Sequence, residues 1–266
     1  MFKDKICLVT GGLGMIGTEL VELLEKEGAK IRIADLKDGC DLTDYRKCKR
    51  LCFGVDYVFH LAGIKGNPKM TEERPVDFIA PMLQFDTNMI RAALVMRVKK
   101  FLYTSSIAVL NPETDKYPAW AKKTAEILID AHRKQYKNGT QFCIVRPANV
   151  YGKHDNFNAE FPMVITDLVN KAVKNKSLEV WGDGSQERDF INAKDVAIAM
   201  MLVMEKMPEE PINIGSGESH SIKEVVEIIK KNIPELKVTY TNKGYIGDKK
   251  RIMDISALKD LGFKSI

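Results

Sequence analysis

Short apolar segments alternate with amphipathic ones along the first 150 residues of the chain. The apolar segments are rich in β-branched and aromatic residues and are bounded by turn formers, which is typical of buried strands. They cover 5–10, 30–35, 55–63, 99–106 and 142–150. Between them, apolar residues recur with the helical period in 18–28, 76–98 and 119–136. Strands that alternate with helices predict an α/β fold with a parallel, doubly wound sheet and right-handed crossovers.

This regular alternation ends after Tyr151. Residues 152–161 are polar and predict a loop, and the rest of the chain mixes short strands with helices. The change predicts a smaller C-terminal α/β lobe. The expected larger domain is 1–151 plus about 189–205, and the expected lobe is about 152–188 plus 206–266.

Composition narrows the possible functions. With 266 residues, 45% apolar and 29% charged, the chain suits a soluble globular protein. No apolar run approaches the ~20 residues of a membrane span. The net charge of +5 suits an anionic small ligand, but the lysines are scattered rather than clustered as nucleic-acid binding requires. The N-terminus enters a strand pattern at once, so we expect no signal peptide and a cytoplasmic location.

The five cysteines predict no metal site. Cys48 and Cys52 share a helix face, but no second Cys or His pair stands at zinc spacing. We therefore expect reduced thiols, mostly in the core.

A glycine-rich turn follows the first predicted strand and opens the first helix. In TGGLGMIG (10–17), Gly11, Gly14 and Gly17 permit a tight turn, close approach of a ligand and tight packing of the helix. The helix N-terminus, with Met15 and Ile16, can then hold a pyrophosphate. This strand–turn–helix context predicts a Rossmann-type dinucleotide site, and a purely structural glycine turn is the alternative.

Acidic residues after the second strand are predicted to bind the adenosine half of the dinucleotide. Asp35 closes that strand, where a carboxylate binds the ribose hydroxyls and repels a 2′-phosphate, so the cofactor is predicted to be NAD rather than NADP. Asp41 and Leu42 follow a predicted short third strand and are placed to meet the adenine. A helix N-cap near Thr43 is the alternative.

The chain resembles the extended short-chain dehydrogenase/reductases that act on nucleotide sugars. The resemblance runs from Lys5 to about Gly262 and adds to the glycine turn the motifs HLAGIK (60–65), YTSS (103–106), RPANVYGKHDNF (146–157), WGDGSQERDF (181–190) and NIGSG (213–217). ERPVDFI (73–79) and HDNF (154–157) are most similar to GDP-fucose synthases, and HLAGIK to UDP-galactose 4-epimerases.

The resemblance implies a chemistry and its residues. In this family a hydride passes between a sugar carbon, usually C4, and NAD while a tyrosine takes the hydroxyl proton. On the matching positions, Ser106 would bind the sugar oxygen, and Ser105 is the neighbouring candidate. Lys122, the first lysine of AKKTAE, would bind the nicotinamide ribose.

Further binding residues follow from the same resemblance. The end of the predicted strand 55–63 and the residues after it would line the cofactor, with Lys65 at the ribose; these residues are Leu61, Ala62, Gly63 and Lys65. Asn149, Arg188 and Arg251 would bind the sugar or its diphosphate, because guanidinium suits bidentate phosphate contacts. A surface ion pair is the alternative for each arginine.

The family also pairs two chains through a four-helix interface. Here that interface would use the helix at 76–97 and the helix that carries Lys122, which implies a homodimer. Burial of the same apolar faces within one chain is the alternative.

One residue departs from the family at the catalytic position. Pro118 stands where the family has its tyrosine, and proline transfers no proton, although it suits the first turn of a helix. Tyr117 lies just ahead of the predicted helix and is the candidate acid/base if its ring reaches the site; a place in the substrate wall or on the surface is the competing interpretation. Water or a sugar hydroxyl acting through Ser106 is the alternative.

Other departures narrow the reaction. The positions of the family's epimerising cysteine and histidine match Ile107 and Met163, which carry no transferable proton. Ile107 and Ala108 also replace the acid pair of the dehydratases. Once epimerisation through the cysteine and histidine and dehydration are set aside, the remaining reaction is hydride transfer. A dehydrogenase or ketoreductase would carry it out on a nucleotide sugar, with a GDP-sugar as one candidate. A 4-epimerase is the alternative enzyme, and an NAD-loaded sensor or scaffold protein is the alternative of another class.

Overall fold

A six-stranded parallel sheet forms the centre of the larger domain. The computed structural model describes residues 1–66, 68–137, 139–157, 162–241 and 249–265. The strand order is β10-β5-β4-β3-β1-β2, and every neighbouring pair is parallel. The strands are β1 (Ile6–Thr10), β2 (Lys30–Ala34), β3 (Tyr57–His60), β4 (Lys100–Thr104), β5 (Gln141–Pro147) and β10 (Ile212–Ile214). This order reverses between β1 and β3, where doubly wound sheets bind their ligands.

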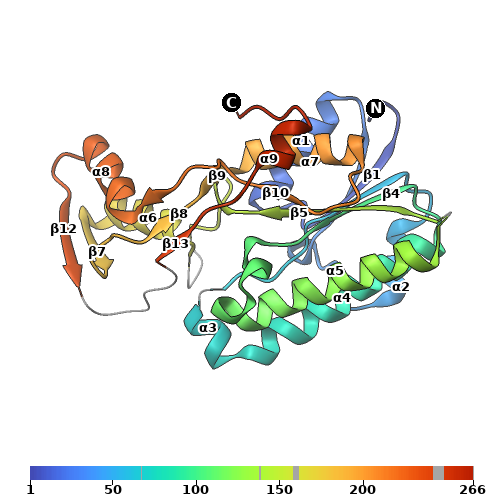
Figure 1. The fold of residues 1–266 in the computed structure, drawn as a ribbon, viewed down its shortest axis with the longest axis horizontal. Coiled ribbons are helices and arrows are strands. Elements are labelled where there is room, and N and C mark those ends of the chain that lie inside the picture. The colour runs from blue at the N-terminus through green and yellow to red at the C-terminus, as the bar shows by residue number, and fades with distance from the viewer. Residues whose placement is uncertain (67, 138, 158–161, 242–248, 266) are drawn as a thin grey trace.

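Helices cover both faces of this sheet (Figure 1). One face carries α2 (Tyr45–Cys52), α4 (Pro75–Val95) and α5 (Lys116–Gln135). The other carries α1 (Met15–Lys26), α7 (Ala193–Lys206) and α9 (Ser256–Asp260). The predicted α/β class with a doubly wound parallel sheet is therefore confirmed.

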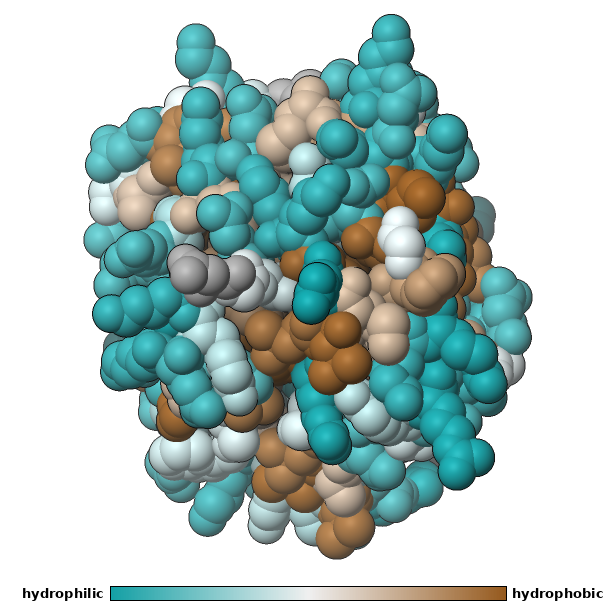
Figure 2. Space-filling model, turned by 90° about the vertical axis from the view of Figure 1, so that its right-hand side faces the viewer, coloured by the Kyte–Doolittle hydropathy of each residue, from teal (hydrophilic) through white to brown (hydrophobic). Residues whose placement is uncertain are grey.

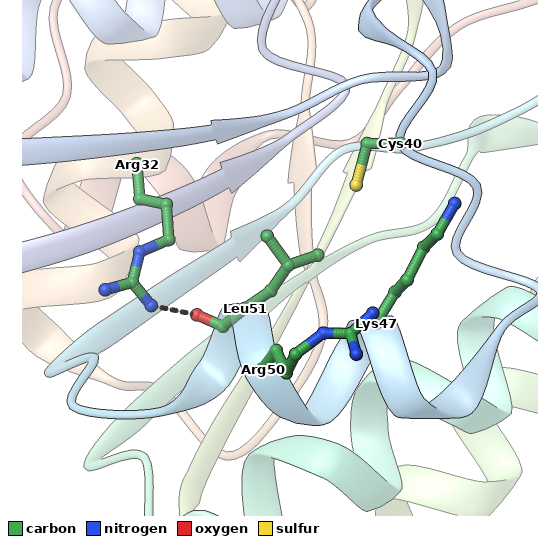
Figure 3. Close-up of a pocket in the computed structure, with 5 residues that line it drawn as sticks. All are labelled: Arg32, Cys40, Lys47, Arg50 and Leu51. Carbon is green, nitrogen blue, oxygen red and sulfur yellow. Dashed lines mark hydrogen bonds between the residues drawn. The ribbon is translucent and has the colours of Figure 1, made fainter.

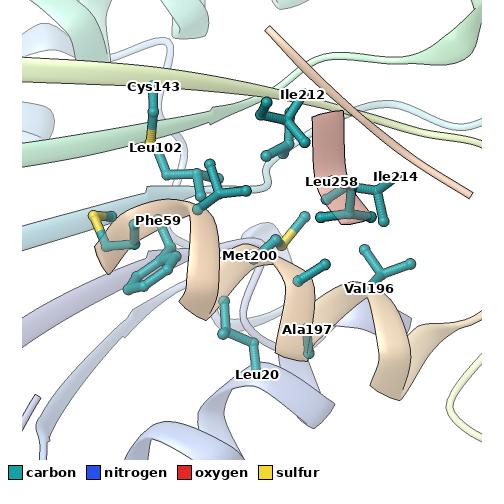
Figure 4. Close-up of a cluster of buried hydrophobic side chains, with 14 of the residues drawn as sticks. Leu20, Phe59, Leu102, Cys143, Val196, Ala197, Met200, Ile212, Ile214 and Leu258 are labelled. Atoms are coloured by element: carbon teal, nitrogen blue, oxygen red, sulfur yellow. The ribbon is translucent and has the colours of Figure 1, made fainter. Parts of the chain in front are cut away.

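The core beneath α1 and α7 joins distant parts of the chain. Leu20 and Met200 are fully buried against Phe59 and Leu102 of the sheet, and Leu258 of α9 closes the cluster (Figure 4). Burying each such side chain contributes about 1.5–3 kcal/mol relative to leaving it exposed. The cluster therefore fixes α1, and with it the glycine turn, against the sheet.

The smaller lobe lies at the end of the molecule that carries α6 and α8 (Figure 1). Parallel strands β7 (Ser177–Trp181) and β12 (Lys237–Thr241) pack with α6 (Val164–Asn175) and α8 (Ile222–Asn232) around their own core. A capping box between Ser221 and Glu224 begins α8. The second sheet of the lobe contains β8 (Glu187–Arg188), β11 (His220–Ser221) and β13 (Lys250–Arg251), while β6 (Asn149–Tyr151) and β9 (Phe190–Asn192) pair near the larger domain.

Two expectations about the fold were wrong. Residues 206–266 do not all belong to the lobe, since β10 pairs with β5 in the main sheet and Met253, Ile255 and Phe263 lie in the large core. No third strand lies between β2 and Asp41; the chain there forms a 3-10 turn at Leu36–Asp38. Strand β10 and the turn at Leu36–Asp38 each have three residues, and in such short segments long-range pairing rather than local pattern decides the structure.

The helices of the described ranges include none that is long and apolar enough to span a membrane.

Candidate dinucleotide and sugar site

The glycine turn has the geometry of a dinucleotide cradle. Gly11 has φ +69°, a conformation that favours glycine, and a Cβ there would stand 3.0 Å from the backbone nitrogen of Ala62. A Cβ on Gly17 would stand 2.2 Å from the carbonyl oxygen of Gly11, so α1 packs directly on the turn. The N-cap Gly14 provides no capping side chain and the first turn contains no acid. The backbone N–H groups of the first turn of α1 can therefore bind a pyrophosphate.

The loop after β3 packs against this turn. Leu61 donates its N–H to the carbonyl of Thr10 at 3.1 Å, and Ala62 donates to the Thr10 hydroxyl at 3.2 Å. The expected cofactor residues Leu61, Ala62 and Gly63 thus lie beside the glycine turn at the sheet's reversal point. Lys65 is 58% exposed, and its Nζ lies 3.6 Å from a carboxylate oxygen of Asp155.

Asp35 stands at the end of β2 and faces the turn. Its carboxylate accepts the N–H of Leu13 at 3.0 Å and that of Lys37 at 3.0 Å. Lys37 extends over the turn and donates from Nζ to the carbonyl of Leu13 at 2.9 Å. A carboxylate and an ammonium therefore lie together where the adenosine ribose is expected.

The two residues expected at the adenine differ in exposure. Asp41 is exposed, and hydrogen bonds from Thr43 lower the pKa of its carboxyl group. Leu42 is buried, and its carbonyl accepts from the side-chain amide of Asn88 at 3.1 Å. The N-cap of α2 is Asp44, so neither residue caps that helix.

Ser106 lies just beyond the carboxyl end of β4. Its hydroxyl accepts the N–H of Ala108 at 3.2 Å and so begins the 3-10 turn Ile107–Leu110. The side chain is half-buried, and the carboxyl end of β4 is the same sheet edge that carries the glycine turn.

Lys122 is buried on α5 beside the loop that packs on the turn. Its Nζ lies 3.5 Å from the carbonyl oxygen of Ala62, 3.7 Å from Oδ2 of Asp86 and 4.7 Å from the centre of the Tyr103 ring. Burial lowers the pKa of this ammonium, and the Asp86 carboxylate opposes the shift. The predicted ribose-binding lysine is thus placed next to the cradle and held by a buried acid.

Asp86 belongs to a buried polar network. Nε2 of His60 lies 2.9 Å from Oδ1 of Asp86, and the Tyr103 hydroxyl donates to Oδ2 at 2.5 Å. The other ring nitrogen of His60 lies 2.6 Å from the hydroxyl of Thr10. Burial lowers the pKa of His60, so a neutral ring donates to Asp86 and accepts from Thr10. The chain of contacts joins Lys122 to the first residue of the glycine motif.

Tyr117 does not lie in a loop ahead of the helix, as we expected. Helix α5 already begins at Lys116, because a proline is tolerated in the first turn, where N–H groups lack helical partners. Five residues of helix turn the chain by about 500°, so Tyr117 and Lys122 point about 140° apart. The tyrosine therefore lies on a different side of α5 from the lysine.

The two arginines expected at the diphosphate lie side by side. Strands β8 and β13 are parallel, with Arg188 opposite Arg251 in register, so both side chains leave the same face of the ribbon. Asn149 uses its backbone N–H and side-chain amide on one acceptor, the carbonyl of Asp189, at 3.1 and 2.9 Å. The structure thus brings the arginines together and gives Asn149 a structural contact.

Comparison with known proteins identifies the family of this chain. Residues 7–215 match the NAD dependent epimerase/dehydratase family, which is more than half of the 266 residues. The chain belongs to this family. The predicted enzyme class is therefore confirmed, and the cofactor is NAD(P).

Several relatives match over nearly the whole chain. A dTDP-4-dehydro-6-deoxy-D-allose reductase of a Streptomyces species is 27% identical over 98% of this chain and 91% of the relative. A GDP-L-fucose synthase of Sinorhizobium fredii is 30% identical over 86% of this chain and 80% of the relative. The solved UDP-N-acetylglucosamine 4-epimerase of Methanobrevibacter ruminantium M1, in complex with UDP-N-acetylmuramic acid, has a TM-score of 0.89 and 27% identity over 99% of this chain and 94% of that chain. These names confirm the predicted likeness to the extended dehydrogenase/reductases of nucleotide sugars.

Sequence reasoning missed two buried carboxylates of this family member. Asp86 lies on the apolar face of α4 between Met82 and Ile90, and an acid at such a position was a usable signal. Asp189 is fully buried and accepts hydrogen bonds from the backbone of Ser216, Gly217 and Met253. It ties the NIGSG loop to the strand segment that carries Arg251.

A shallow pocket between β2 and α2 lies apart from this site (Figure 3). It is lined by Arg32, Cys40, Lys47, Arg50 and Leu51. Arg32 donates to the carbonyls of Leu51 and Phe53 and so holds the C-terminal end of α2 against the edge strand. We assign this basic pocket a structural role at the rim of the sheet.

Proposed function

We propose that the protein is an NAD-dependent oxidoreductase that transfers a hydride to or from C4 of a nucleotide-activated sugar. The observation that carries the proposal is the position of Lys122, whose Nζ lies 3.5 Å from Ala62 in the loop packed on the glycine turn. The paired arginines of the lobe supply the cations that a sugar diphosphate requires. The relatives named above act on nucleotide sugars, which supports the same substrate class here.

Each residue has a defined part in this reaction. The nicotinamide ring, when bound, supplies hydride donation or acceptance. Lys122 binds the ribose next to that ring, and Ser106 orients the sugar oxygen through a hydrogen bond. Arg188 and Arg251 hold the diphosphate. Ile107 follows Ser106 directly and offers no proton, which supports hydride transfer rather than dehydration.

We propose GDP as the nucleotide because HDNF (154–157) is similar to the GDP-fucose synthases. A 4-epimerase is the second candidate, since the solved 4-epimerase structure covers 99% of this chain with a TM-score of 0.89. An NAD-bound sensor without turnover is the candidate of another class, supported by Pro118 at the tyrosine position.

A screen separates these functions. The purified protein is incubated with NAD or NADH and GDP-, UDP- and dTDP-sugars, while absorbance at 340 nm and the products are followed. Net oxidation or reduction of one sugar supports the oxidoreductase. Interconversion of two sugars without net change in NADH indicates the epimerase, and dinucleotide retained without turnover of any sugar indicates the sensor.

We also propose that the protein is cytoplasmic and forms a homodimer through α4 and α5. Val76 and Ile127 on these helices are 67% and 58% exposed. Figure 2 shows apolar surface (brown) within a hydrophilic surround at the end of the molecule where α4 finishes. Light scattering at micromolar concentration is expected to give about twice the 30.0 kDa chain mass. A monomer mass under these conditions would count against the dimer.

A further inference from the structure

Helix α5 carries an acid on the same side as Lys122. Asp115 is the N-cap residue of α5 and lies seven residues before Lys122. Seven residues turn a helix by about 700° and advance it by about 10 Å, so the Cα of Asp115 lies about 20° from that of Lys122 around the axis and about two turns nearer the N-terminus. Pro118, one turn nearer to Lys122, shares this side but has no proton to give. Helical side chains lean toward the N-terminus, which directs this side of α5 toward Asp115.

The Asp115 carboxyl group does not cap its own helix. An N-cap aspartate ordinarily accepts hydrogen bonds from the first turn, but this side chain makes none. Its Oδ1 atom is fully buried and has no hydrogen-bond partner among the described residues. Buried polar atoms in native proteins are normally paired, so an unpaired acceptor here calls for a donor that the free chain lacks. A sugar hydroxyl is such a donor.

Two other elements pack against this carboxyl group. Thr71 of α3 (Pro68–Glu73) hydrogen-bonds it, and Arg251 of β13 approaches it from the lobe. The neighbouring charges on its own segment, Glu113 and Lys116, lie 3.9 Å from each other. Asp115 therefore lies at the start of the helix that carries Lys122 and next to Arg251, one of the two arginines expected at the diphosphate.

We infer that Asp115 is the acid/base residue of this site and takes the role of the tyrosine that Pro118 displaces. This inference rests on the proposed hydride transfer. In the oxidation, Asp115 accepts the hydroxyl proton as the O–H bond breaks and the C=O bond forms, while the C–H hydrogen leaves with its electron pair for the nicotinamide. In the reduction, protonated Asp115 returns the proton to the new hydroxyl.

The surroundings of Asp115 favour this role. Burial raises the pKa of its carboxyl group, and Arg251 opposes the rise. When a substrate diphosphate pairs with Arg251, Asp115 loses part of its cationic neighbour and becomes a stronger base. Oxidation requires the carboxylate, so its rate is expected to rise as pH increases through the Asp115 pKa, and reduction is expected to fall over the same interval.

The test uses Asp115→Asn in the full-length protein, with Glu113→Gln as the matched control on the same segment. Loss of a general base is expected to lower kcat about 10²–10⁴-fold. The KM for the sugar should change less than about threefold, and the acidic limb of the oxidation profile should disappear. Formate is expected to restore part of the activity of Asp115→Gly. A raised KM with unchanged kcat, or loss of activity in Tyr117→Phe with Asp115→Asn still active, overturns the assignment.

A second measurement does not depend on turnover. Calorimetry of nucleotide-sugar binding near pH 6, in two buffers of different ionisation enthalpy, counts the protons taken up on binding. Uptake in the wild type that is absent in Asp115→Asn supports the inference, and equal uptake in both overturns it. A wild type that turns over no sugar contradicts the proposed function alone, because the proton count is read separately.

Discussion

Lys122→Met is expected to lower kcat/KM by about 10²–10⁴-fold, because in the proposed reaction the ammonium would make two charge-assisted hydrogen bonds of about 1.5–3 kcal/mol each with the nicotinamide ribose. Lys122 is also buried beside Asp86, with 3.7 Å between Nζ and Oδ2. Removing it leaves a buried carboxylate without its cation, which is expected to cost about 3–5 kcal/mol of the free energy of unfolding. Steady-state kinetics and urea denaturation measure the two losses.

A double variant separates the catalytic loss from the structural one. Lys122→Met with Asp86→Asn removes both charges, and we expect it to recover most of the lost stability but none of the activity. Lys123→Met removes the neighbouring ammonium, which is 36% exposed, and should keep activity within about threefold. Full activity in Lys122→Met, or recovery of activity in the double variant, would show that Lys122 serves only to neutralise Asp86.

The parts of the fold that the sequence predicts correctly are those with strong local periodicity. The strand–turn–helix unit around TGGLGMIG lies where its pattern places it, as β1 and α1. Strand β10 has only three residues, and its local pattern suits either sheet. Its parallel pairing with β5, over 60 residues away, is a tertiary contact that no local pattern contains. The error in the domain boundary follows from that difference.

In the candidate site, too, some positions follow from the local sequence pattern and others from tertiary packing. Gly17, Asp35 and Ser106 stand at strand ends or helix starts, so chain order alone places them on one edge of the sheet. The contact between Lys122 and Asp86 joins two helices, and the approach of Arg251 to Asp115 joins two lobes. Such pairs depend on how the helices and lobes pack together. The sequence therefore predicts the arrangement of the residues at the strand ends better than the contacts between helices and between the domain and the lobe.

Asp35→Asn is expected to have the second large effect, a change in the preference for NAD over NADP. The Asp35 carboxylate stands at the end of β2, and its two oxygens accept the N–H groups of Leu13 and Lys37 at 3.0 Å each. Losing one charge-assisted hydrogen bond to the adenosine ribose is expected to weaken NAD binding by about 1.5–3 kcal/mol, or about 10–150-fold. NADP should bind more tightly at the same time, because the repulsion of its 2′-phosphate is removed while the Lys37 ammonium stays beside the turn.

Weaker NAD binding together with tighter NADP binding distinguishes a role of Asp35 in cofactor recognition from general damage to the glycine turn. Titration of both dinucleotides, followed by nicotinamide fluorescence or calorimetry, should show the NAD-to-NADP affinity ratio falling more than about 100-fold in Asp35→Asn. Asp38→Asn removes the same charge from the exposed end of the same 3-10 turn and should leave the ratio unchanged. If Asp35→Asn weakens both dinucleotides equally, the carboxylate only supports the backbone of Leu13. If the wild type already prefers NADP, Lys37 rather than Asp35 controls the choice, since its Nζ is held 2.9 Å from the turn with its charge available to a phosphate.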